Sequence, residues 1–122
     1  MFDKFFPDRY VASTYVIDFE GLYKEGVRGL IFDIDNTLVP HGAPADERAR
    51  ALFKRLKSIG FRCCLISNNQ KPRVEMFNKD IQVDYVYNAH KPSIRNYLKA
   101  MEIMGTDRDS TVFIGDQLFT DV

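Results

Sequence analysis

At 122 residues the chain has the length of a single domain, residues 1–122, and is long enough to bury a substantial hydrophobic core. Lys plus Arg and Asp plus Glu balance at 17 each, which excludes a global electrostatic attraction to nucleic acid or to an anionic membrane. There is no secretory signal and no apolar run near the roughly 20 residues of a membrane span. Cys63 and Cys64 are adjacent in an apolar run, so we expect a cytoplasmic protein with reduced cysteines and without nucleic acid as a partner.

The first segment, residues 1–27, is rich in aromatic side chains, and we expect it to pack on the core. Pro7 prevents one continuous helix, so a short helix is predicted from about Asp18 to Glu25, with Asp18 as its cap and Gly26 as its stop. Covering one edge of a sheet is the commoner role for such aromatics. The alternative is a patch that faces a lipid surface or a partner, so peripheral contact with a membrane stays open.

Residues 30–39 form an apolar run that is typical of a strand buried on both faces in the middle of a parallel sheet. Asp33 and Asp35 lie near its C-terminal end, and if the extended geometry persists, both project to one side together with Thr37. Two such carboxylates repel each other by roughly 4 kcal/mol at about 4 Å with an effective dielectric near 20, a repulsion that a bound cation would offset. An isolated Asp-x-Asp is more often a polar turn, but the longer run Asp-Ile-Asp-Asn-Thr-Leu after a strand is more specific.

Alternating elements follow this strand. A loop at residues 40–44 leads to a helix predicted at 45–59, and a strand is predicted at 61–66. Strand, helix and strand make the right-handed unit of a doubly wound sheet, in which ligands gather at the C-terminal strand ends. Ser67 is therefore expected at the same edge of the sheet as Asp33. Further helices are predicted at 71–79 and 93–104, and further strands at 84–87 and 110–114, which gives the α/β class with a Rossmann-like parallel sheet.

Four motifs, each directly after a predicted strand, resemble in order the signatures of the haloacid-dehalogenase-like (HAD) superfamily. The motifs are Asp33-Ile34-Asp35-Asn36-Thr37-Leu38, Ser67-Asn68-Asn69, Lys91-Pro92 and Gly115-Asp116 with Asp121. The resemblance implies Mg²⁺-dependent phosphoryl transfer in which Asp33 is the nucleophile and Asp35 the general acid and base. That second role requires a raised pKa for Asp35.

The same resemblance assigns the other site residues. Ser67 and the neighbouring Asn68 N–H would hold a phosphate oxygen, and Thr37 is placed with these substrate-binding residues. Lys91 would neutralise the nucleophile and the incoming phosphate. The metal ligands it implies are Asp33, Asp35, Asp116 and Asp121, with Asp121 either a direct or a water-mediated ligand. The loop after Thr37 is too short for the large inserted cap of many HAD enzymes, so an open site is expected. His41 on that loop could touch a leaving group, although a solvated loop histidine is commoner.

In its details the sequence is similar to the YqeG-like branch of HAD subclass IIIA, which also contains phosphatidylglycerophosphate phosphatases. A lipid head group of that kind, a soluble phosphomonoester and a phosphoprotein all fit as substrate. The sequence stops at Val122, where the family continues. We therefore expect either a truncated domain, or a fourth strand whose exposed edge is covered by another chain, such as a second copy. The rival hypotheses are a HAD-like scaffold that binds a phosphorylated partner without turnover, and a receiver domain. Asn88 argues against the receiver, which needs an Asp after its third strand.

Overall fold

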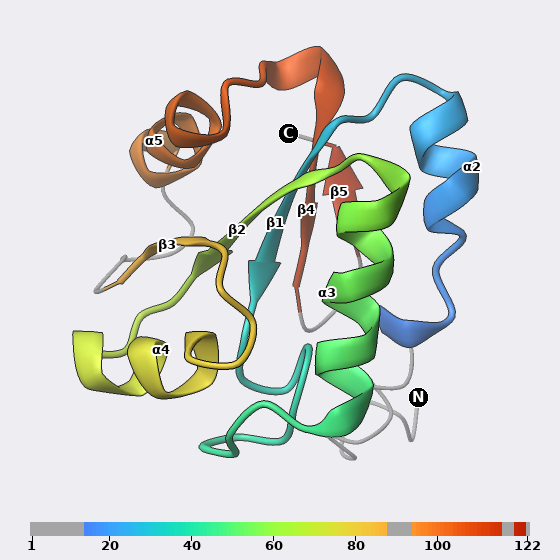
Figure 1. Cartoon of the computed structure of the whole chain (residues 1–122). Helices are drawn as coiled ribbons and strands as arrows, with labels where there is room; N and C mark the ends of the chain where they lie inside the picture. The colour runs from blue at the N-terminus through green and yellow to red at the C-terminus, as the bar shows by residue number, and fades with distance from the viewer. Residues whose placement is uncertain (1–13, 88–93, 116–118, 122) are drawn as a thin grey trace, which may run out of the picture.

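The computed structural model describes residues 14–87 and 94–115, together with the backbone of residues 119–121. Its centre is one five-stranded sheet with the strand order β3-β2-β1-β4-β5. The parallel strands β1, β2, β3 and β4 pair with their neighbours, and β5 runs antiparallel to β4 at the edge (Figure 1). The strands are β1 (Gly29–Asp33), β2 (Arg62–Ile66), β3 (Asp84–Val86), β4 (Thr111–Ile114) and β5 (Phe119–Asp121). The predicted α/β class with a doubly wound parallel sheet is confirmed.

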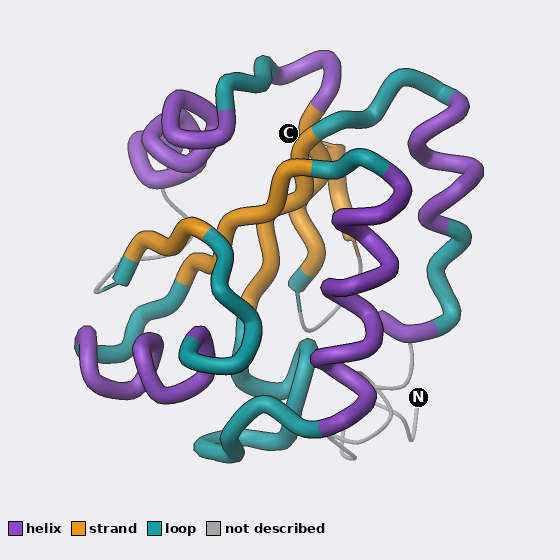
Figure 2. The backbone as a smooth tube through the Cα atoms, viewed as in Figure 1, coloured by secondary structure: helices purple, strands orange, loops and turns teal. Residues whose placement is uncertain are grey.

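Helices cover both faces of the sheet, as the purple segments around the orange strands show in Figure 2. Side chains of α2, α3 and α4 share one hydrophobic cluster with one face, and α5 packs on the opposite face. The helices are α2 (Phe19–Lys24), α3 (Glu47–Ile59), α4 (Lys71–Asn78) and α5 (Ile94–Met104), and a short 3₁₀ helix spans Arg108–Ser110. No helix in the described part of the chain is long and apolar enough to cross a membrane.

The central strand β1 is buried on both sides, which explains its uninterrupted apolar sequence. Successive side chains of a strand point to opposite faces, so Phe32 joins the cluster under α3 while Ile31 joins the cluster under α5. The Phe32 ring packs edge-on against Phe53 of α3, with 5.1 Å between ring centroids. This packing holds β1 in place against α3, and so helps to set the position of the acidic residues at the end of the strand.

The N-terminal segment joins the core where it is described. Asp18 caps α2 by accepting a hydrogen bond from the Gly21 N–H, as predicted. Phe19 is fully buried and packs against Phe61 at 6.3 Å between ring centroids. It therefore lies within the core and does not merely cover an edge of the sheet. The aromatic residues before Thr14 lie outside the described residues.

Two expectations about the sheet are wrong. The strand predicted over residues 30–39 ends at Asp33, because the chain then turns sharply. The edge of β4 was expected to be exposed, but β5 pairs along it with Ile114 opposite Phe119 and Val112 opposite Asp121. The exposed edge that suggested a covering second copy is therefore occupied by this chain itself.

Candidate functional site

The C-terminal ends of three neighbouring strands meet at one edge of the sheet. In the ladder, Asp33 of β1 lies opposite Ile66 of β2, and Phe32 lies opposite Ile114 of β4. Ser67 and Gly115, the next residues of β2 and β4, thus lie level with the end of β1. A Cβ atom added to Gly115 would lie 3.8 Å from Asp33 Oδ2, an ordinary contact, but only 2.7 Å from the Phe113 ring, so a side chain at this position would force that ring to shift.

After Asp33 the chain forms a tight turn. The carbonyl of Ile34 accepts the N–H groups of Thr37 at 3.2 Å and Leu38 at 3.0 Å, and Asn36 adopts a positive φ of 63°. Thr37 is fully buried, and its hydroxyl has no hydrogen-bond partner among the described residues. The expected continuation of the extended chain from Asp33 to Thr37 is therefore wrong. Because of the turn, Thr37 does not lie where a continuing strand would have placed it.

The turn presents Asp35 to three hydrogen-bond donors from three different segments. Its Oδ1 accepts from the Gly42 N–H of the following loop at 2.7 Å and from Nη2 of Arg73 on α4 at 2.7 Å. Its Oδ2 accepts from Nδ2 of Asn69, in the turn after β2, at 2.8 Å. The Asp35 side chain is 16% exposed, and His41 Nδ1 lies 4.0 Å from its Oδ1. The carboxylate is thus held by the loop, by the β2–α4 turn and by the helix together.

These donors determine the ionisation of Asp35. Partial burial alone would raise its pKa, but the hydrogen bonds from Arg73 and Gly42 and the positive charge of Arg73 outweigh the burial, so the pKa lies below the usual value for aspartate. The raised pKa that we expected for Asp35 is therefore wrong for this arrangement. An ionised carboxylate at this position is suited to accept a proton.

Ser67 and the residues after it close the second strand at the same edge. Ser67 is 3% exposed, and its N–H donates to the carbonyl of Val86 at 3.0 Å. Its Oγ accepts a hydrogen bond from the Asn69 N–H at 3.0 Å. That bond uses a lone pair of the oxygen and leaves the hydroxyl hydrogen as a donor. Asn68 lies between them and is exposed.

Asp33 and Asp35 are the predicted metal ligands that the structure describes in full. Asp116 and Lys91 lie outside the described residues, and β5 contains Asp121, whose side chain is likewise outside them. Within the described part of the chain, no three acidic, histidine or cysteine side chains converge as a complete metal site. The described carboxylates supply only part of the oxygen ligands that a hard cation such as Mg²⁺ prefers.

Two residues of the site, Asn69 and Arg73, were not predicted from the sequence. Arg73 lies in the first turn of α4, which begins at Lys71 and contains Pro72 at its start. A cation near a helix N-terminus opposes the helix dipole, so an arginine at this position was the signal that could have marked it. Asn69 carried a weaker signal, because an asparagine just before a helix usually serves as a cap.

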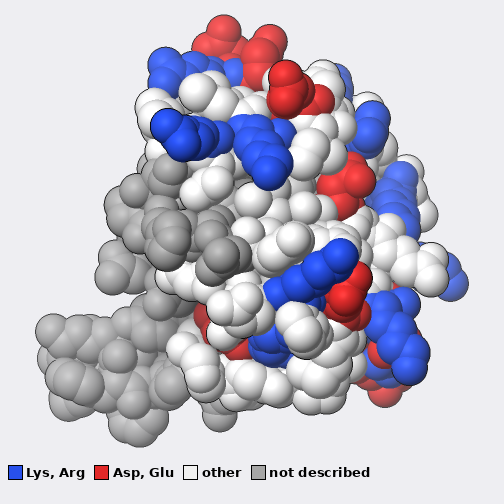
Figure 3. Space-filling view, turned by 90° about the vertical axis from the view of Figure 1, so that its left-hand side faces the viewer, with Lys and Arg blue, Asp and Glu red and all other residues white. Residues whose placement is uncertain are grey.

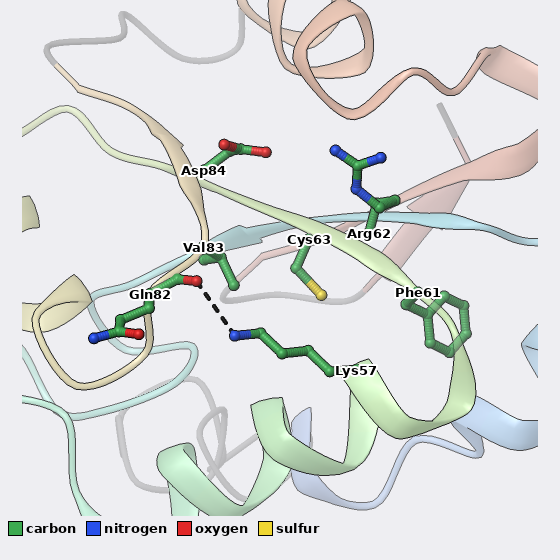
Figure 4. A pocket seen from close by; sticks show the side chains of 7 residues that line it. All are labelled: Lys57, Phe61, Arg62, Cys63, Gln82, Val83 and Asp84. Carbon is green, nitrogen blue, oxygen red and sulfur yellow. Dashed lines mark hydrogen bonds between the residues drawn. The ribbon is translucent and has the colours of Figure 1, made fainter.

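A shallow cavity lies at the opposite end of the sheet, where β2 and β3 begin (Figure 4). Its lining residues are Lys57, Phe61, Arg62, Cys63, Gln82, Val83 and Asp84. Lys57 Nζ donates to the carbonyl of Gln82 at 3.3 Å, so its ammonium group ties α3 to the chain after α4. The cavity contains none of the predicted site residues, and the edge that bears Asp33 remains the candidate active site.

Known proteins similar to this chain point to the same chemistry. Residues 41–122 match the family of haloacid dehalogenase-like hydrolases. The chain is 37% identical over 124 residues to the "Probable phosphatase YqeG" of Bacillus subtilis (strain 168), and the match covers 100% of this chain and 72% of that protein. The resemblance to the YqeG-like branch is thereby confirmed.

Solved structures show the same fold at low sequence identity. A hypothetical protein from Xanthomonas campestris is 19% identical, with a TM-score of 0.61 over 81% of this chain and 61% of that one. A Vibrio cholerae protein assigned as a 3-deoxy-D-manno-octulosonate 8-phosphate phosphatase is 16% identical, with a TM-score of 0.59 over 76% of this chain and 59% of that one. The chain thus spans about three fifths of each of these structures. The family match and the similarity to YqeG place this chain in the haloacid dehalogenase-like hydrolase family, in its phosphatase branch.

Proposed function

We propose that the chain hydrolyses phosphomonoesters in a Mg²⁺-dependent reaction that passes through a phosphoaspartate on Asp33. The observation that carries the proposal is the arrangement at the end of β1. Asp33 ends the central strand, Asp35 is held beside it by three donors, and Ser67 lies at the same edge. Such a reaction needs a nucleophilic carboxylate, a group that transfers protons and a hydrogen-bond donor that holds the phosphate.

In the first half of the reaction, a carboxylate oxygen of Asp33 attacks phosphorus, and the bond from phosphorus to the ester oxygen breaks. The departing oxygen leaves as an alcohol by taking a proton from Asp35, which must therefore enter this half of the reaction protonated. In the second half, water attacks the phosphorus of the phosphoaspartate, and Asp35 takes a proton from that water. Inorganic phosphate is released and Asp33 is regenerated. In this arrangement the lowered pKa keeps Asp35 ionised, as the second half requires, and the first half requires that the negative charge of the bound phosphate raise this pKa.

The phosphoryl group itself is held by donors. The Ser67 hydroxyl hydrogen, which the bond to the Asn69 N–H leaves available, would donate to a phosphate oxygen. Lys91 and the Asn68 N–H are proposed to act on the same group. Thr37 is kept as a proposed substrate residue, and its buried hydroxyl without a partner among the described residues is compatible with a ligand or a water nearby.

The oxygen chemistry of the site fits a magnesium ion. The Asp33 carboxylate and the Asp35 backbone carbonyl would hold the ion together with Asp116, and Asp121 would be a further acidic ligand. Asp116 directly follows Gly115 in the sequence, and Gly115 lies beside Asp33 in the fold. When bound, the ion supplies positive charge that stabilises the phosphoryl oxygens. A cation at this edge would offset the negative charge of the Asp33 carboxylate.

The proposed substrate class rests on the resemblance to the YqeG-like branch of the family and on the exposed apolar side chains of the surface. A phosphatidylglycerophosphate-like head group, a soluble phosphomonoester and a phosphoprotein all present a terminal phosphate. Exposed apolar side chains just after β3 and on α5, namely Tyr87, Ile94 and Leu98, favour a substrate or membrane surface with an apolar part. Figure 3 shows this side of the molecule, where the basic side chains of the described residues lie among acidic and uncharged ones.

Phosphate release from a generic aryl phosphomonoester tests the proposal. The wild-type protein is expected to release phosphate with Mg²⁺ and to stop when a chelator removes the ion, and Asp33→Asn is expected to abolish turnover. Asp80→Asn, a change at an exposed aspartate after α4, is the matched control and should retain activity. A folded wild-type protein that binds the phosphomonoester with Mg²⁺ but releases no phosphate would favour the binding scaffold instead.

A further inference from the structure

Tyr87 lies beside Ser67, the residue proposed to bind the phosphoryl group. The Ser67 N–H donates to the carbonyl of Val86 at 3.0 Å, so the parallel pairing of β2 with β3 continues past Ile66 and Val86. In a parallel ladder this bond places Ser67 opposite Tyr87, at a strand spacing of about 4.8 Å. Tyr87 is 43% exposed, so it stands at the edge of the candidate site in contact with solvent.

Neighbouring residues hold the Tyr87 ring. Tyr87 follows Tyr85 by two positions on the same face of the sheet, and the centroids of the two rings are 6.3 Å apart. Tyr85 is itself tied to α4, because its hydroxyl donates to Glu75 Oε2 at 3.2 Å. Tyr87 is thereby packed at the point where β3 meets α4.

Lys71, the first residue of α4, brings a positive charge to the same point. It is exposed, and its Nζ lies 5.9 Å from the centroid of the Tyr87 ring, within the range of a cation–π contact. Glu75 stands one helical turn further on, where an acidic residue can pair with a lysine, but it accepts a hydrogen bond from Tyr85 instead. In the part of the chain that the structure describes, Lys71 forms no ion pair, so its charge is available to a ligand.

The other cation in the first turn of α4 is not available in this way. Arg73 pairs with Asp35 at 2.7 Å, and both side chains are largely buried. Lys71 and Arg73 are two positions apart, which is about 200° around a helix, so the two cations leave α4 in nearly opposite directions. Of these two charges, the one that lies over Tyr87, beside Ser67, is not compensated by an acidic side chain of the described residues.

We propose that Lys71, held over Tyr87, favours phosphomonoesters whose leaving alcohol carries a second anionic group, a carboxylate or a phosphate. The inference rests on the phosphatase function proposed above. Ser67 holds the phosphoryl group, and the leaving group extends across the Tyr87 ring toward the ammonium group of Lys71. A positive charge at this place attracts an anionic leaving group more than a neutral one, and salt screens the attraction because the lysine is exposed.

The test uses two pairs of substrates in the full chain at a fixed concentration of free Mg²⁺. Glycerol 3-phosphate and 3-phosphoglycerate differ in a hydroxymethyl group or a carboxylate at the far end, and sorbitol 6-phosphate and 6-phosphogluconate differ in the same way over a longer chain. In at least one pair, Lys71→Met is expected to lower the ratio of kcat/KM for the anionic substrate over the neutral one by about two- to fivefold, as for an exposed ion pair. Lys71→Glu should lower this ratio further, and Lys71→Arg should restore most of it. The effect of Lys71→Met should shrink when NaCl is raised from about 0.05 M to about 0.5 M.

The matched control is Lys79→Met, which makes the same change in net charge at an exposed lysine at the other end of α4 and should leave the ratio unchanged. A ratio that Lys71→Met and Lys71→Glu leave unchanged in both pairs would overturn the inference, and so would an equal fall with Lys79→Met. A wild type that hydrolyses the aryl phosphomonoester but none of these four substrates would overturn it as well. A wild type that hydrolyses no phosphomonoester at all would instead overturn the proposed function itself.

Discussion

Replacing Ser67 with alanine separates two roles of this side chain at the end of β2. Its Oγ accepts the Asn69 N–H at 3.0 Å, and the residue is 3% exposed. Losing this bond removes about 0.5–1.5 kcal/mol, and the amide left behind adds part of a desolvation cost of about 1–3 kcal/mol. We expect the free energy of unfolding to fall by about 1–2 kcal/mol, which lowers Tm by roughly 3–10 °C in a domain of this size.

The second role is donation of the hydroxyl hydrogen to the phosphoryl group. A hydrogen bond to a charged group is worth about 1.5–3 kcal/mol, so kcat/KM is expected to fall about 10- to 150-fold. Phosphate release is measured well below the Tm of the variant, and stability is measured separately by urea denaturation. Ser67→Thr keeps the hydroxyl and should retain most activity. Ser58→Ala, which removes an exposed hydroxyl that donates to the Lys54 carbonyl at 3.1 Å, is the neutral control.

The result that would refute this reasoning is specific. If Ser67→Ala loses the expected stability but keeps the kcat/KM of the wild type, the hydroxyl only shapes the turn before α4. The phosphate-binding role would then have to be withdrawn.

Other predictions concern the scaffold. Asp46→Ala removes the side chain that accepts a hydrogen bond from the Ala49 N–H at 2.8 Å at the start of α3. In a urea titration this change should lower the free energy of unfolding by about 1 kcal/mol, and Asp46→Asn should restore most of the loss. Equal urea midpoints for the wild type and both variants would contradict the role of Asp46 as a helix cap. Burial raises the pKa of the Cys63 and Cys64 thiols to about 12, so iodoacetamide at pH 8 should label them only after unfolding. Because the unfolded thiols ionise near 9.0, the free energy of unfolding should fall as the pH rises from about 9 toward 12. Rapid labelling of the folded protein would contradict the burial.

Much of the fold could be predicted because its signals are local. The apolar run before Asp33 needs helices on both faces, and the structure supplies them. A helix was predicted at residues 45–59 from an apolar stripe of Leu52, Phe53, Leu56 and Ile59. The helix forms at Glu47–Ile59, where the first three of these residues are buried and Ile59 is partly buried. Ser67 could be placed at the edge that bears Asp33 because parallel strands joined by a helix end on the same side.

The sharp turn after β1 could not be predicted, because apolar residues give no sign of which element buries them. Leu38 and Val39 are as buried as the strand before them, but they are buried by a turn that depends on Asn36 at positive φ. β5 is only three residues long, and its antiparallel pairing is a tertiary event without a periodic pattern. Arg73 was missed for a related reason, since its contact with Asp35 joins residues 38 positions apart.

The central claim is that a phosphoryl group is carried by Asp33, and trapping that intermediate tests it most directly. The protein is mixed with a phosphomonoester and Mg²⁺, quenched in acid and treated with borohydride, which reduces a phosphoaspartate to homoserine. Peptide mass spectrometry then locates the changed residue. The account predicts homoserine at Asp33, only when substrate is present. Reduction at Asp35 instead, or no reduction while phosphate is being released, would contradict it.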